Sequence, residues 1–117
     1  GSETFKSKFD DMINAATPAN KKRLGNKLDS VTRNKIDAFI RNSNVSAQKK
    51  SDASKLSKEM VETFEKLPEF EADDAQQQID QVLSDWGVMR NAYPKGTRKP
   101  DYKALLTLLV FFQIQSQ

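Results

Sequence analysis

Residues 79–115, IDQVLSDWGVMRNAYPKGTRKPDYKALLTLLVFFQIQ, hold the strongest fold signal in the chain. An amphipathic helix ends at Trp86-Gly87, and a loop rich in Pro, Gly and basic residues follows. The next segment, 105–112, is apolar on nearly every side. Such a helix has to be wrapped by other helices or by lipid, and this one is too short to span a bilayer. It is therefore predicted to be the central helix of an all-α bundle.

Helical periodicity continues towards the N-terminus. Over residues 3–16, apolar side chains recur at i, i+4, i+7, i+8 and i+11, which places them on one helical stripe. A second helix is expected after Thr17-Pro18, because Thr is a good N-cap and Pro suits the first helical position. A third, short helix containing Ile36 and Phe39 is expected, with Ser30 or Thr32 as its cap.

Two more helices are expected before the apolar one. The first has its stripe at spacings of 4, 4 and 3 and ends at Pro68. That stripe is made of Leu56, Met60, Phe64 and Leu67. The second is expected to begin at Asp73 or Asp74 and to bury Trp86 on its apolar stripe, with Gly87 as a left-handed C-cap. No alternation typical of strands competes, so an antiparallel bundle of about six helices is predicted.

The residue types that are missing limit the chemistry. The 117 residues include no cysteine and no histidine. Thiolate catalysis, disulfides and zinc–thiolate sites are thereby excluded, and so is the usual acid–base group near neutral pH. The interpretation is a protein that is not an enzyme, with no cofactor, no metal and no small-molecule substrate. Without a signal peptide or a membrane span, a cytoplasmic location is expected.

The length suits one domain. Gly1-Ser2 resemble the remnant of an expression tag, so residues 3–117 are interpreted as a single helical domain.

The net charge of +3 hides strong segregation. Residues 1–58 hold 13 Lys and Arg against 6 Asp and Glu, a formal charge of +7. Residues 59–89 hold 1 against 9, which is −8, and residues 90–117 hold 5 against 1, which is +4. Separate basic and acidic zones allow a chain to bind copies or relatives of itself, positive face to negative face.

Two kinds of candidate partner-binding residue follow from this pattern. The predicted acidic patch is Glu69, Glu71, Asp73 and Asp74. The predicted basic patches are Lys21, Lys22, Arg23 and Lys27, and then Arg90, Lys95, Arg98 and Lys99 in the long loop. Each charged run could also be an ordinary solvated surface, and the acidic run could simply favour a helix N-terminus.

The end of the chain resembles a divergent death domain of the Toll-pathway type, the type found in Pelle, Tube and the interleukin-receptor-associated kinases. The resemblance rests on Asp85-Trp86-Gly87 at the end of one helix and on the Leu-rich run that follows at residues 105–112. It implies that Leu24 and Leu28 belong to the family's first-helix core. It also implies a non-catalytic adaptor in innate immune signalling that forms homotypic assemblies with another death domain.

Two alternatives to that function stay open. Residues 18–41 could make the domain a basic helical binder of nucleic acid, although the acidic block would repel phosphate. The domain could also be a helical assembly or chaperone factor unrelated to death domains. No membrane partner is expected.

Overall fold

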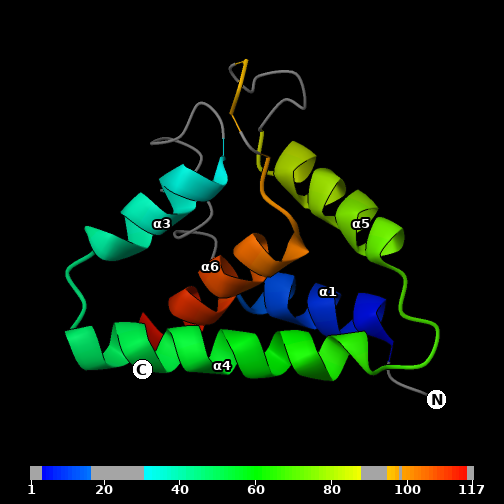
Figure 1. The fold of residues 1–117 in the computed structure, drawn as a ribbon, viewed down its shortest axis with the longest axis horizontal. Coiled ribbons are helices and arrows are strands. Elements are labelled where there is room, and N and C mark those ends of the chain that lie inside the picture. The colour runs from blue at the N-terminus through cyan, green and yellow to red at the C-terminus, as the bar shows by residue number, and fades with distance from the viewer. Residues whose placement is uncertain (1–3, 17–30, 88–94, 98, 116–117) are drawn as a thin grey trace.

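The computed structural model describes residues 4–16, 31–87, 95–97 and 99–115. This part of the chain contains five helices and no strand (Figure 1). The helices are α1 (Phe5–Ala15), α3 (Arg33–Arg41), α4 (Ala47–Glu65), α5 (Ala72–Asp85) and α6 (Tyr102–Gln115). The all-α class is thus confirmed, but the predicted count of six helices is not. The helix expected after Thr17-Pro18 lies outside the described residues, apart from its last stripe position, Val31, which is buried.

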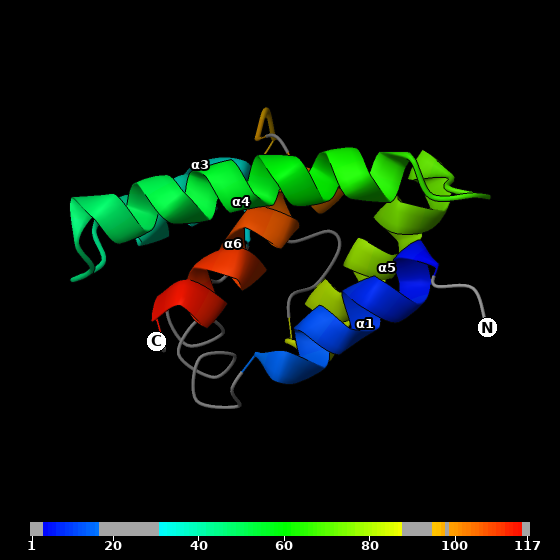
Figure 2. The same cartoon turned by 90° about the horizontal axis from the view of Figure 1, so that it is seen from below.

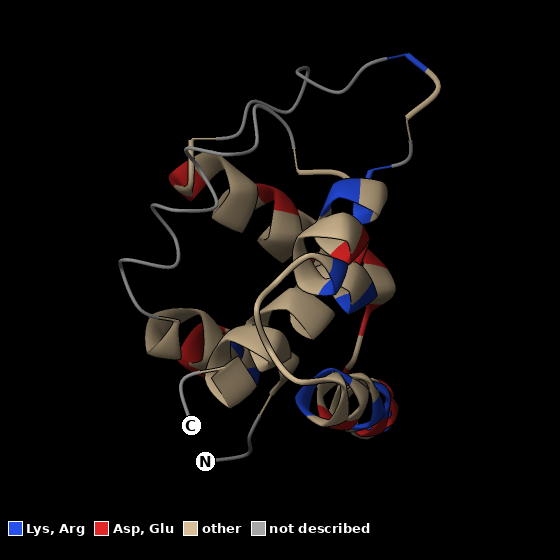
Figure 3. Ribbon diagram, turned by 90° about the vertical axis from the view of Figure 1, so that its left-hand side faces the viewer, with Lys and Arg blue, Asp and Glu red and all other residues tan. Residues whose placement is uncertain are grey.

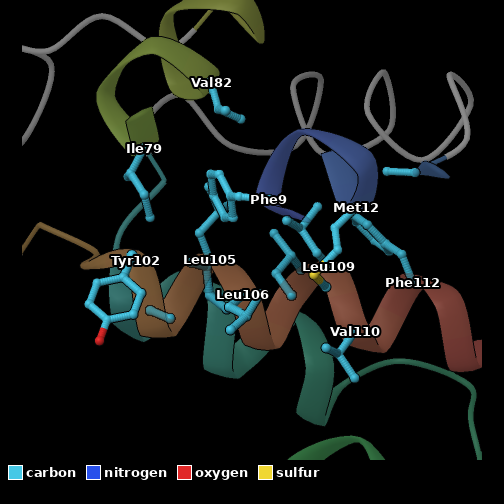
Figure 4. Packing of buried hydrophobic residues seen from close by; sticks show 14 of the residues in the cluster. Phe9, Met12, Ile79, Val82, Tyr102, Leu105, Leu106, Leu109, Val110 and Phe112 are labelled. Atoms are coloured by element: carbon cyan, nitrogen blue, oxygen red, sulfur yellow. The ribbon is translucent and has the colours of Figure 1, made fainter. Parts of the chain in front are cut away.

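The apolar helix is central, as predicted. α6 packs against each of the other four helices, and the close view in Figure 4 shows side chains of α1 and α5 pointing towards it. Asp101 starts α6, because its Oδ1 accepts a hydrogen bond of 3.0 Å from the backbone N–H of Ala104. Nine of its side chains are buried, each worth about 1.5–3 kcal/mol when it is large and apolar. They are Tyr102, Ala104, Leu105, Leu106, Leu108, Leu109, Val110, Phe111 and Phe112.

α1 forms because its first turn is capped and its stripe is apolar. The Thr4 side chain accepts from the Ser7 backbone, and the Ser7 side chain accepts from the Thr4 backbone, which makes a capping box. The predicted stripe faces the core, with Phe9 fully buried. The ring of Phe5 lies 5.1 Å from that of Phe64 on α4 and 5.7 Å from that of Tyr102 on α6, centre to centre, so aromatic contacts hold α1 against two helices.

α4 lies along the longest dimension of the molecule, and α6 crosses it obliquely in the generally opposite direction (Figures 1 and 2). Its predicted stripe is wrong at one position, since Leu56 is 39% exposed. The buried face instead passes through Ala53, Ser57 and Phe64. Small residues allow the two backbones to approach closely, and Ser57 reaches the Thr107 hydroxyl on α6 at 2.7 Å. Counting only large apolar residues misses such a face.

The N-caps of α3 and α5 can be compared with the remaining predictions. Thr32 caps α3, because its hydroxyl accepts a hydrogen bond of 3.1 Å from the Lys35 backbone. α5 begins earlier than predicted, with Glu71 at the N-cap and no side-chain cap bond. Asp73 and Asp74 are therefore not caps. They lie in the first turn, where carboxylates interact favourably with the helix dipole.

The structure differs from the prediction that Trp86 is buried on the apolar stripe of α5. Trp86 is the C-cap residue, one position beyond the helix, and it is half-buried against the core rather than enclosed within it. Gly87 follows with a φ of 82°, so the predicted left-handed glycine is confirmed. Because Trp86 lies beyond the last helical residue, its side chain does not continue the apolar stripe of α5 and covers the edge of the core instead.

Candidate functional site

A groove lies between α1 and α5, closed at one end by the connection between α4 and α5. Its volume is about 710 Å³. Apolar side chains form part of its lining, including Phe5 and Ile13 from α1, Pro68 and Phe70 from the connection, and Val82 from α5. Phe70 is held by edge contacts to Phe5 and Tyr102, each with ring centres 5.6 Å apart. Apart from Pro68, which is exposed, these apolar side chains belong to the core or pack against it, so this part of the lining is pre-formed.

The rim of the groove is strongly acidic. Three segments contribute to its five carboxylates, which are Asp10, Glu69, Glu71, Asp74 and Asp85. Lys6 is the one basic residue among the described lining, so the formal charge there is −4. Opposite charges are absent from most of the rim, and the field of these carboxylates adds up inside the hollow.

The structure brings together most of the predicted acidic patch. Glu69, Glu71 and Asp74 all line this groove, whereas Asp73, although exposed, does not. Charge density along the chain identified these three. It could not identify Asp10 or Asp85, because they are distant in sequence and reach the groove only when α1 packs beside α5.

A polar stripe on α5 provides one wall. Its residues follow the helical spacing i, i+3, i+4, i+7 and i+11, and they are Asp74, Gln77, Gln78, Gln81 and Asp85. This stripe runs beside the apolar stripe that faces α6. The spacing was visible in the sequence, but a polar stripe usually means only a solvated face, so it carried no signal before α1 was placed opposite it.

Two glutamines on that stripe are fixed by acidic partners. The side-chain amide of Gln78 donates to Asp10 Oδ1 at 2.8 Å and to the backbone oxygen of Lys6 at 3.2 Å, which ties α5 to α1. Gln81 donates to Asp85 Oδ1 at 2.9 Å along the helix. These bonds hold the wall of the groove in a defined arrangement.

The rim also contains a backbone conformation that is uncommon for its residue type. Glu69 has a φ of 65°, in the left-handed region, directly after Pro68. A residue with a Cβ atom loses about 1–2 kcal/mol there relative to the right-handed conformation. This reversal turns the chain from the end of α4 towards α5.

Of the predicted basic patches, the structure describes only two residues, and neither lines the groove. Lys95 and Lys99 are exposed in the segment before α6 and lie away from the groove lining. The other six residues, Lys21, Lys22, Arg23, Lys27, Arg90 and Arg98, lie outside the described residues. Figure 3 shows acidic residues on α1 and α5, while Lys and Arg colour the start of α3 and the segment before α6.

A change of charge along α4 was not predicted from the sequence. Up to residue 58 the helix carries four lysines and one aspartate, and after it three glutamates. They are Lys49, Lys50, Lys55 and Lys58 with Asp52 among them, followed by Glu59, Glu62 and Glu65. This order opposes the helix dipole, which favours acids at the N-terminus and bases at the C-terminus. The polarity of α4 is thus not explained by helix stability.

Comparisons with protein-family models, with curated proteins and with solved structures find no match to this chain. Within the described ranges, no group of three or more Asp, Glu, His or Cys residues is arranged so that it could bind a metal ion. In the same part of the chain, no helix combines the length and apolarity needed to cross a membrane.

Proposed function

We propose that this domain is a non-catalytic docking module, and that the groove between α1 and α5 receives a basic surface of a protein partner. One observation supports this most directly: five carboxylates from three separate segments meet around one groove, with a single lysine in the lining that the structure describes. A hollow lined by one sign of charge raises the local concentration of oppositely charged groups and speeds their association.

The sign of the groove distinguishes between partner classes. The phosphates of nucleic acids are repelled by carboxylates, so nucleic acid does not fit this site. A protein surface rich in Lys or Arg does fit. The mixed lining supports the same choice, because apolar side chains beneath a polar rim are typical of protein interfaces.

The partner that we propose is another death domain, including a second copy of this chain. Two features support the family: α5 ends at Asp85-Trp86-Gly87, and the Leu-rich helix that follows, α6, is buried at the centre. Lys55 and Lys58 support the homotypic form, because both are exposed and lie one turn apart on α4, where they offer positive charge to the groove of a second copy. Unlike surfaces on one chain produce heterologous contacts.

Asp74 and Asp73 give a matched pair for testing the groove. They are neighbours with the same side chain, both exposed in the first turn of α5, but only Asp74 lines the groove. Asp74→Lys is expected to weaken association with a second copy, or with a Toll-pathway death domain, by about three- to tenfold at low salt. Asp73→Lys is expected to change it much less.

Association is measured by sedimentation and by surface binding at low and moderate salt, with helicity checked for each variant. Changing Lys55 and Lys58 to Glu in one copy should weaken its binding to the wild-type groove and restore part of its binding to Asp74→Lys. Equal effects of the Asp73 and Asp74 changes would refute docking in the groove. Salt-sensitive binding of random duplex DNA, with no protein association, would favour the nucleic-acid function instead.

A further inference from the structure

Besides its negative charge, the groove has a defined pattern of hydrogen-bond donors and acceptors. Ionised carboxylates and backbone carbonyls only accept hydrogen bonds. The contacts of Gln78 with Asp10 and with the Lys6 backbone oxygen therefore require that its NH₂ group face those partners. The contact of Gln81 with Asp85 requires the same of its NH₂ group. Chemistry fixes the orientation of both amides.

The consequence is a groove wall rich in acceptors, on which Gln77 is a further amide that can both donate and accept. Gln78 uses its two N–H donors within the protein, and Gln81 uses one. Neither carbonyl oxygen receives a hydrogen bond from the part of the chain that the structure describes. Together with the carboxylates of Asp74 and Asp85 on the same helix, they offer a ligand lone pairs and few donors.

Building on the proposed function, we propose that the groove selects arginine side chains of the partner rather than positive charge in general. A guanidinium carries five N–H donors in a planar fork and accepts none, so it can bind a carboxylate and an amide oxygen together. A lysine ammonium is a compact point charge that keeps its water more strongly. A lining of fixed, neighbouring acceptors therefore favours Arg over Lys at equal charge.

The geometry of α5 suggests the probe. Asp74 and Asp85 are eleven residues apart, which is about 16 Å along a helix. Two cations four residues apart in an extended peptide lie on the same face and span about 13 Å, at about 3.3 Å per residue, and their long side chains cover the remaining distance. We would use two capped peptides that differ only in whether both of these cations are Arg or both are Lys, with Gly and Ser elsewhere.

Titration calorimetry with the whole chain should show the Arg peptide binding at least about threefold more tightly than the Lys peptide. Gln81→Met removes one acceptor without changing any charge, so it should bring the two affinities closer together by weakening the Arg peptide. Gln48→Met is the control, because Gln48 donates to Asp52 at 2.9 Å on α4 in the same i, i+4 arrangement, away from the groove. That control should leave the Arg preference unchanged.

The outcomes separate this inference from the proposed function. Equal affinities for the two peptides, no binding of either, or equal effects of the Gln81 and Gln48 changes would overturn the arginine selection. The docking function would still stand if Asp74→Lys alone impaired protein association. If the Asp73 and Asp74 changes acted alike on protein association, the docking function itself would fail.

Discussion

Gln78 on α5 joins α1 through Asp10, with 2.8 Å between the amide nitrogen and the carboxylate oxygen. The same amide donates to the Lys6 backbone oxygen, so one side chain bridges the two helices twice. α1 precedes the rest of the described fold in sequence, and its position beside α5 creates the acidic groove. This bridge therefore links the stability of the domain to the shape of its candidate site.

Removing the bridge should destabilise the fold modestly. We expect Gln78→Ala to lower the free energy of unfolding by about 1–2 kcal/mol, because it deletes two hydrogen bonds at a half-buried position. Gln77→Ala is the control: Gln77 is an exposed neighbour on the same wall, and its change should stay within about 0.5 kcal/mol. Urea denaturation followed by circular dichroism measures both, and equal effects would mean that the bridge contributes nothing.

Changing charge without changing shape should separate docking from folding. Asp10→Asn keeps an oxygen that can accept from Gln78 and removes one negative charge from the groove. Stability should therefore change by less than about 1 kcal/mol, while association with a basic partner weakens at low salt. Thermal melting and binding are measured on the same preparation. A large loss of stability would show that the carboxylate charge itself is needed for the bridge.

The sequence predicted more of the fold than of the site, and α4 and α6 show why. The run from Leu105 to Phe112 is apolar on nearly every side, so its central position follows from burial alone. On α4 the same reasoning assigned Leu56 to the core and overlooked Ser57, because the close approach of two helices selects small residues. The groove itself was not predicted, and only three of its lining residues, Glu69, Glu71 and Asp74, belong to the predicted acidic patch. Its other wall depends on a tertiary contact that no local pattern contains.

The exposed position of Leu56 and the buried position of Ser57 allow a test of the α4–α6 interface. Ser57→Leu should lower the free energy of unfolding by about 2–3 kcal/mol or more, because a large side chain cannot enter a closely packed contact. It also removes the hydrogen bond to Thr107. Leu56→Ser, one residue earlier, should change stability by less than about 1 kcal/mol, since Leu56 is 39% exposed. The opposite ranking in chemical denaturation would favour the stripe predicted from the sequence.

Trp86 should matter less than a fully enclosed aromatic residue. Its half-buried position at the C-cap of α5 predicts a loss of about 1.5–3 kcal/mol for Trp86→Ala. Phe9→Ala, at a fully buried position on α1, should cost about 3–5 kcal/mol. Chemical denaturation of the two variants checks the position of Trp86. If Trp86→Ala lowers the free energy of unfolding as much as Phe9→Ala does, then Trp86 is fully buried in the core and not half-buried at its edge.

We expect ionisation of Tyr102 to lower the stability of the folded protein at alkaline pH. Its hydroxyl donates a hydrogen bond to Glu65, and it lies buried at the start of α6. Burial first, and then the hydrogen bond and negative charge of Glu65, raise the pKa of Tyr102 well above its ordinary value of 10. Because the folded pKa exceeds the unfolded one, the stabilisation is fully present below about pH 10 and is lost as pH rises further.

The variant Tyr102→Phe tests this expectation, because it keeps the ring contacts with Phe5 and Phe70 but has no proton to lose. The melting temperature of the wild type should therefore fall more steeply above about pH 10 than that of Tyr102→Phe, with parallel curves between about pH 7 and 9. Parallel curves through the alkaline range would show that Tyr102 ionises as easily in the folded protein as in the unfolded chain.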